Sequence, residues 1–226
     1  MKKTKRLTAG LIILIMALSL FTACDGDGIG GGKSDYKITA GGWDGDTFTN
    51  EWSNITFTLP ETMRKLGNRE LLDISLMVQG ASSNHEGFAG TQRDISDGSA
   101  FVDFAVVERE VQESFIMVYY VGGNKDETAQ DIIDEVVSEN MEYIRANFGV
   151  IPKRASDTTT RIAGETFQKG GYYIEFEDEG SDEVFTLFTD YLVRKQGDIF
   201  IIFVVEYDDI DKDDIMDVLD SIKAVK

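Results

Sequence analysis

The chain has 226 residues and a formal net charge of −19, from 41 acidic and 22 basic side chains. A polyanion of this kind is repelled by nucleic-acid phosphates and by anionic lipid headgroups, and no cluster of basic residues follows the first few positions, which argues against a nucleic-acid partner. Hydrophobic residues make up 42% of the chain and aromatic residues 11%, which is enough to build a packed core.

The first 23 residues have the layout of a secretory signal peptide. Four basic residues stand among the first six, and an apolar run from 11 to 21 is interrupted only by Ser19. A spanning helix needs about 20 apolar residues, so this run is too short to cross a bilayer. We therefore predict a leader at 1–23, whose removal would take the net charge from −19 to −23.

The junction after the leader, Leu20-Phe21-Thr22-Ala23-Cys24, resembles the bacterial lipobox. In that family the cysteine carries a diacylglycerol and the new amino terminus is often acylated, and two or more acyl chains anchor a protein stably. The resemblance implies lipidation of Cys24 and attachment to the extracytoplasmic face of the cell membrane. It departs from the pattern at Phe21, where leucine is usual. The alternative is an ordinary secretory peptide followed by a chance cysteine.

The cysteine count limits the chemistry further. Cys24 is the only cysteine, so no internal disulfide can form. Once it is lipidated, the chain has no thiol, which excludes cysteine catalysis and cysteine-ligated zinc.

Residues 24–40 are predicted to be the lipidated cysteine and a flexible tether rich in glycine and aspartate, followed by a single domain at 41–226. Gly26, Gly28 and Gly31 have the spacing of a dinucleotide-binding fingerprint. That motif needs a strand before it and a helix after it, and both are missing here.

The first predicted elements are short strands at 47–52 and 54–60, where apolar residues alternate with threonines. Proline cannot donate to a β-ladder, so Pro60 ends the second strand. Segment 68–78 is compatible with a helix or a strand, and the helix is preferred. Segment 79–100 is rich in Gly, Ser, Asn and Asp, which predicts a loop.

Strands are predicted at 101–109 and 115–121, the second apolar on both faces and therefore central in its sheet. The clearest helix is predicted at 126–147, with acids at its start and Gly149 after its end. Its apolar stripe consists of Ala129, Ile132, Ile133, Val136, Val137, Met141, Ile144 and Phe148.

Four further strands are predicted at 157–162, 166–177, 185–195 and 199–207, and a last helix from about Asp211. The loops between the last three strands are too short for a crossover, so these strands must be antiparallel. The order of elements predicts an α+β fold, an antiparallel β-sheet with the long helix and the C-terminal helix packed on it.

Three segments resemble PsbP-like domains, which have the Mog1/PsbP fold. They are the aromatic-x-Asn-x-aromatic segment 48–52 leading into Phe-x-Leu-Pro at 57–60, the Ile-x-Gly-x-x-Phe hairpin at 161–167, and the closing strand at 200–203 with its helix. The resemblance covers residues 47–226 and departs after Pro60, where a Gly-Trp pair is usual.

Several kinds of protein belong to this family. Many members are bacterial lipoproteins of unassigned function, plant members help photosystem II to retain its inorganic cofactors, and the yeast relative binds a small GTPase. The fold itself implies no shared catalytic site.

The titratable residues assign no catalytic, cofactor or metal site. His85 is the only histidine and lies in a Gly- and Ser-rich segment typical of an exposed loop, whereas a Ser-His-Asp site would require it. The acids of 208–214 lack the ligand spacing of a calcium loop. They suit the start of a helix capped by Asp208 or Asp211, with weak cation binding left as an alternative.

A set of aromatic residues could line a ligand pocket, although aromatics at sheet positions are typical of a core. These residues are Trp43, Trp52, Tyr119, Tyr120, Tyr172 and Tyr173.

The sequence therefore predicts a non-enzymatic, lipid-anchored accessory or binding module, with an envelope protein or a small ligand as its partner. The alternative is a carboxylate-based cation-binding protein or hydrolase of the cell envelope. Carboxylates that converge in a concave pocket would favour this alternative.

Overall fold

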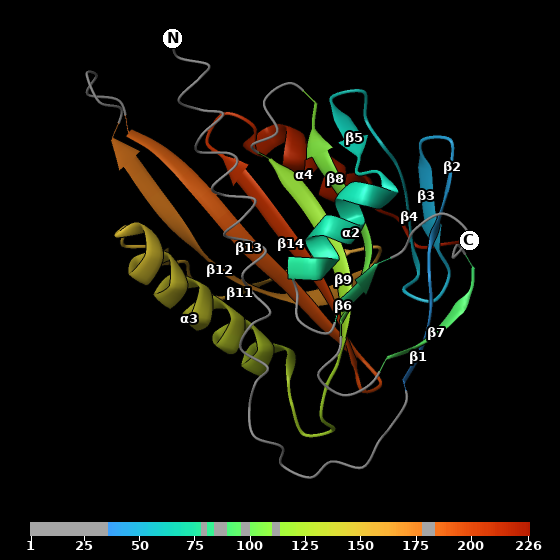
Figure 1. Ribbon diagram of the computed structural model, residues 1–226. Coiled ribbons are helices and arrows are strands. Elements are labelled where there is room, and N and C mark those ends of the chain that lie inside the picture. The colour runs from blue at the N-terminus through green and yellow to red at the C-terminus, as the bar shows by residue number, and fades with distance from the viewer. Residues whose placement is uncertain (1–35, 78–80, 84–89, 96–99, 110–113, 178–183) are drawn as a thin grey trace.

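The computed structural model describes residues 36–77, 81–83, 90–95, 100–109, 114–177 and 184–226 (Figure 1). Within these ranges the protein is a mostly-sheet α+β fold with antiparallel sheets and three helices, as predicted. The helices are α2 (Asn68–Met77), α3 (Ala129–Phe148) and α4 (Lys212–Ser221). The strands are β1 (Tyr36–Thr39), β2 (Gly42–Asp44), β3 (Thr47–Asn50), β4 (Ile55–Thr58), β5 (Met63–Lys65), β6 (Ala81–Ser83), β7 (Gln92–Ile95), β8 (Ala100–Glu108), β9 (Phe115–Gly122), β10 (Lys153–Arg154), β11 (Thr158–Ile162), β12 (Glu165–Glu177), β13 (Val184–Gln196) and β14 (Ile199–Asp208).

The main sheet has the order β10-β12-β13-β14-β9-β8-β5, with β11 added to β12 and β6 to β8. Only the β6–β8 ladder is parallel among the described pairs. Strands β12, β13 and β14 are antiparallel, as predicted from their short connections. Every residue of β14 is buried, because this strand and β9 lie in the middle of the sheet with both faces covered.

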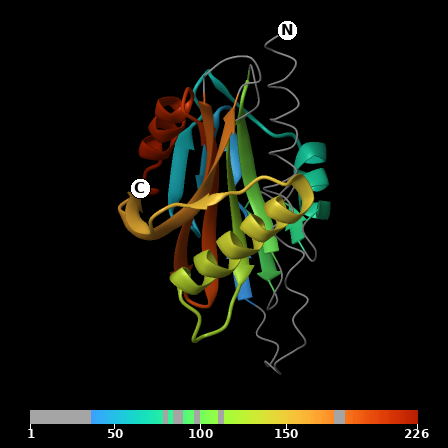
Figure 2. The ribbon, with the colours of Figure 1, turned by 90° about the vertical axis from the view of Figure 1, so that its left-hand side faces the viewer.

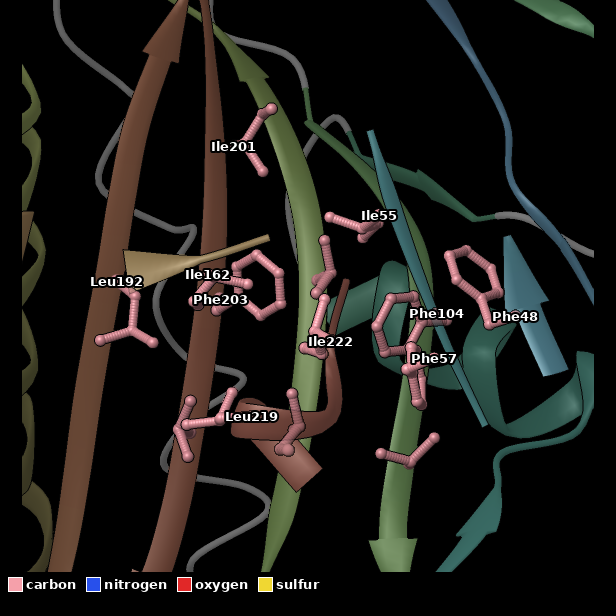
Figure 3. Packing of buried hydrophobic residues seen from close by; sticks show 14 of the residues in the cluster. Phe48, Ile55, Phe57, Phe104, Ile162, Leu192, Ile201, Phe203, Leu219 and Ile222 are labelled. Carbon is pink, nitrogen blue, oxygen red and sulfur yellow. The ribbon is translucent and has the colours of Figure 1, made fainter. Parts of the chain in front are cut away.

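The two faces of the main sheet carry separate apolar clusters. On one face, the small sheet β2-β3-β4 and helix α4 contribute side chains such as Phe48, Phe57 and Leu219, which point toward Phe104 and Phe203 of the main sheet (Figure 3). On the other face, α2 and α3 contribute their buried residues. Figure 2 shows α4 and α2 on opposite sides of the sheet. The apolar alternation of the strands therefore produces a layer on each side.

Helix α3 begins and ends where the local chemistry satisfies its backbone. Thr128 is the N-cap and forms a capping box with Asp131, and Gly149 follows in the left-handed conformation with φ 68°. The Nζ of Lys195 donates to the carbonyls of Asn124, Lys125 and Glu127 at 2.7–2.9 Å, which fixes the turn before the helix. The helix packs on β12 and β13.

Several short strands were not predicted from the sequence. The predicted loop 79–100 contains β6 and β7, so that prediction is wrong for these residues. Strand β1 lies inside the predicted tether 24–40 and pairs with β7, so the folded part begins no later than Tyr36. These strands have three or four residues and depend on partners far away in the chain. None of the helices in the described ranges is both long and apolar enough to span a membrane.

The pairing of β12 with β13 leaves no space for a side chain at Gly171. A Cβ there would lie 2.2 Å from the Thr189 carbonyl oxygen and 3.1 Å from the Asp190 Cα, so the backbones would have to separate. We expect Gly171→Ala to lower the free energy of unfolding by about 3 kcal/mol or more, measured by urea denaturation. Gly67→Ala is the control, because its Cβ would meet nothing closer than 3.6 Å. Equal losses in the two variants would contradict this account.

Candidate functional site

Three features singled out in the sequence lie outside the described residues. These are Cys24, the glycine-rich segment that follows it, and His85. The signal peptide and the lipidation of Cys24 therefore stay predictions, and the role of His85 is not tested.

The acidic segment 208–214 forms the start of α4. Asp208 Oδ1 accepts hydrogen bonds from the backbone N–H groups of Ile210 and Asp211 at 2.7 and 2.8 Å. Asp211 occupies the N-cap position without a side-chain cap bond, and its Oδ2 accepts from Ser114 Oγ at 3.2 Å. Burial, followed by the charge of Asp208, raises the pKa of Asp211. These contacts serve the helix start rather than a ligand.

The aromatic residues considered for a pocket are divided between the two faces of the sheet. Tyr119 and Tyr172 belong to the cluster beneath α2 and α3, whereas Tyr120 belongs to the opposite cluster, against which Trp43 and Trp52 pack. Tyr173 is half-buried, with its ring 5.9 Å from that of Phe188. The six residues therefore do not line one common pocket.

A buried polar network joins the small sheet to the main sheet. Asp103 is 1% exposed and accepts from Gly41 N (2.9 Å), Asn50 Nδ2 (2.7 Å) and the Tyr120 hydroxyl (2.7 Å). A register shift between Val102 and Phe104 in β8 accommodates Asp103 at this point. Three donors compensate for the loss of hydration, so a charged carboxylate is tolerated inside the core.

Asn50 extends this network to two further segments. Its Nδ2 also donates to the Thr39 carbonyl at 2.9 Å, and its Oδ1 accepts from Ser53 N at 3.0 Å. Burial and then the charge of Asp103 raise the pKa of Tyr120 well above its ordinary value, so its hydroxyl stays a neutral donor. The network therefore binds β1, β3, β8 and β9 together, and we refer to it as the Asp103 network.

Two of the three segments that resemble PsbP-like domains, 48–60 and 161–167, meet at Arg194. Its Nη2 donates to the Ser53 carbonyl at 3.3 Å and to Gln196 Oε1 at 2.9 Å, and its guanidinium lies 5.4 Å from the centre of the Phe167 ring. Its Nη1 is 3.5 Å from Glu165 Oε2, at the start of β12. Arg194 therefore clamps the β3–β4 turn to the β11–β12 hairpin.

The surface has a shallow recess of about 310 Å³ beside the small sheet. It is lined by Asp46, Leu59, Pro60, Glu61 and Arg109. Arg109 Nε donates to the Met63 carbonyl at 2.8 Å, so this guanidinium is held in place. The volume lies at the lower limit of small-molecule sites, and a lining with one arginine and two carboxylates matches no particular ligand.

The sequence carries a signal for two of the buried acidic residues, although neither was predicted to be buried. Asp103 interrupts an apolar strand at 100–107, and Glu206 interrupts another at 199–207. A charged residue within such a run must either find partners or lose its charge when the strand is buried. The partner itself could not be read from the sequence.

The comparisons with known proteins gave structural matches only. No family model matches the chain, and no curated protein matches it. Among solved structures, PsbP (CyanoP) of the cyanobacterium Synechocystis aligns at 14% identity with a TM-score of 0.45, over 88% of this chain and 97% of that one.

Two further structures align with the chain. LpqN of Mycobacterium tuberculosis, described as involved in cell envelope biogenesis, aligns at 11% identity with a TM-score of 0.42, over 87% of this chain and 93% of that one. A structure from Bacteroides thetaiotaomicron aligns at 13% identity with a TM-score of 0.37, over 80% of this chain and 49% of that one.

The Asp103 network predicts different costs for removing two tyrosine hydroxyls. Tyr120→Phe removes a charge-assisted donor to buried Asp103, so we expect a loss of about 2–3 kcal/mol in the free energy of unfolding at neutral pH. Tyr173→Phe is the matched control, because that half-buried residue packs through its ring on Phe188. We expect its effect to stay below about 0.5 kcal/mol. Chemical denaturation measures both, and similar losses would refute the role given to the network.

Proposed function

We propose that this protein is a lipid-anchored accessory or binding module on the extracytoplasmic face of a cell membrane, without catalysis of its own. The observation that carries the proposal is the leader layout of residues 1–23, which is followed directly by Cys24, the only cysteine of the chain. The partner would be an envelope protein or a small ligand.

The use of three of the four buried carboxyl groups among the described residues supports a module without catalysis. Asp103 is held by the network described above, and Asp208 by two backbone donors. Asp190, 5% exposed, accepts from Lys169 Nζ at 2.7 Å and from the Tyr207 hydroxyl at 2.8 Å. Each of the three ties strands or turns together, so its hydrogen-bonding capacity serves the fold.

The alternative, a carboxylate-based cation-binding protein or hydrolase, requires converging acids. In the part of the chain that the structure describes, no three or more His, Cys, Asp or Glu side chains are placed to hold a metal ion. No specific observation therefore favours this alternative among the described residues.

The anchor can be tested at one position. We expect Cys24→Ser to release the protein from the membrane fraction and to abolish incorporation of a radiolabelled fatty acid, because the chain has no other thiol to acylate. Phe21→Leu, which brings the junction closer to the usual lipobox, is the control and should be lipidated and processed at least as well as the unchanged chain. Membrane association and labelling that survive Cys24→Ser would refute the anchor.

Thermal unfolding of the Cys24→Ser protein separates the two functions. A ligand present at 100 times its Kd stabilises the folded state by about 2.7 kcal/mol, which gives a readable shift in Tm. We expect no shift with EDTA or with millimolar calcium. A clear calcium shift that EDTA reverses would favour the cation-binding alternative.

A further inference from the structure

The recess beside the small sheet, of about 310 Å³, is built from three segments of the chain. These are the β2–β3 turn, the β4–β5 connection and the position after β8, and they contribute Asp46, Leu59, Pro60, Glu61 and Arg109. Backbone hydrogen bonds join the segments: Leu59 N donates to the Asp46 carbonyl at 2.7 Å, and Arg109 N donates to the Thr62 carbonyl at 2.9 Å. The walls of the recess are therefore fixed by the fold.

Arg109 brings a positive charge whose hydrogen-bonding capacity is only partly used. Its Nε donates to the Met63 carbonyl at 2.8 Å, which restrains the guanidinium. The N–H groups on Nη1 and Nη2 make no hydrogen bond or ion pair to a residue in the described ranges. Two terminal nitrogens of an arginine can bind a carboxylate or a phosphate through two parallel hydrogen bonds. Arg109 is thus prepared to receive an anionic group.

Two carboxylates of the same recess are also unused. Asp46 and Glu61 are exposed, and neither side chain forms a hydrogen bond or an ion pair within the part of the chain that the structure describes. Arg109 does not neutralise them, since it takes part in none of the ion pairs among the described residues. The recess therefore presents both signs of charge, and each is left for a ligand.

This combination of charges argues against two simple classes of ligand. A metal ion would be repelled by the Arg109 guanidinium, and no three metal-ligating side chains converge among the described residues. A simple anion would lie near two carboxylates, in a chain of net charge −19. A ligand with an anionic and a cationic group meets neither objection. The residue types of the lining select no ligand, but their unpaired state among the described residues does.

The remaining lining of the recess is apolar. Leu59 and Pro60 offer hydrocarbon surface next to the charged groups. A volume of about 310 Å³ limits the ligand to a small molecule. A small molecule that combines a carboxylate, an ammonium group and an apolar part is an α-amino acid with an aliphatic side chain.

We infer that this recess binds a zwitterion of the α-amino-acid type, with its carboxylate on Arg109 and its ammonium group on Asp46 or Glu61. The aliphatic side chain would lie against Leu59 and Pro60. The inference rests on the proposed binding module, because it specifies the chemistry of the small ligand. Phosphoethanolamine, the headgroup of a zwitterionic lipid, carries the same pair of charges but has no side chain to cover the apolar lining.

Titration of the Cys24→Ser protein with leucine, followed by NMR of the backbone amides, tests the site. We expect saturable shifts at Asp46, Glu61 and Arg109, with a Kd of about 1 mM or lower. The titration is run at about pH 6.5, where the amino groups are charged. Leucinamide lacks the carboxylate and 4-methylpentanoate lacks the ammonium group. Each should bind at least about tenfold more weakly than leucine, because one charge-assisted contact is lost.

Variants of the recess assign each charge to its partner. Arg109→Gln should weaken leucine at least about tenfold and leave leucinamide unchanged. Asp46→Asn together with Glu61→Gln should weaken leucine but not 4-methylpentanoate. This second variant does not endanger folding, since neither carboxylate has a side-chain contact among the described residues. Arg161→Gln, which changes an exposed arginine of β11, is the control and should bind leucine as the unchanged recess does.

Four results would overturn the inference. They are no saturable binding up to about 10 mM leucine, equal binding of leucine and leucinamide, an unchanged Kd in Arg109→Gln, and tighter binding of phosphoethanolamine than of leucine. The last would assign the recess to a lipid headgroup. None of these results concerns the anchor, which the labelling of Cys24 tests separately. Failure of the ligand site and failure of the lipid-anchored module can therefore be told apart.

Discussion

The burial of Asp103 is the interaction on which the arrangement of layers depends. Its carboxylate is tolerable inside the core only when donors arrive from the backbone at Gly41, from Asn50 and from Tyr120. These donors belong to different segments of the chain, so the charge is satisfied in one arrangement of the small sheet on the main sheet. The apolar cluster around Phe48, Phe57 and Phe104 closes in that same arrangement. Apolar packing supplies the attraction, and the Asp103 network supplies the specificity.

The central position of β14 and β9 sets a second constraint. Since both faces of these strands are covered, any polar side chain on them must be matched inside the protein. Tyr120 and Asp208 are matched, whereas Glu206 is matched only in part. An acidic residue in the middle of an otherwise apolar strand can therefore hold neighbouring segments together when enough hydrogen-bond donors reach it. When too few donors reach it, the carboxyl group stays incompletely hydrogen-bonded.

The proposed role depends on where in the cell the domain is anchored. The lipobox-like junction at Cys24 would place the domain at a membrane, and its acidic surface would keep it away from anionic headgroups. The described carboxyls that are buried serve the interior, with Glu206 as the exception. Recognition of a partner would then use surface features, such as the recess beside Arg109 or the hairpins that meet at Arg194.

By itself, the sequence determined the secondary elements whose hydrophobic period extends over many residues. It indicated α2, α3, α4 and the strands β8, β9 and β11 to β14, because a repeat of 3.6 or 2 residues is a local property. The strands β1, β2, β5, β6, β7 and β10 were missed, since segments of two to four residues carry no readable period. The hydrogen-bond partners of Asp103, Arg194 and Glu206 were likewise decided by the tertiary structure. Sequence shows that a charged residue lies in an apolar run, but only the folded chain determines which donors reach it.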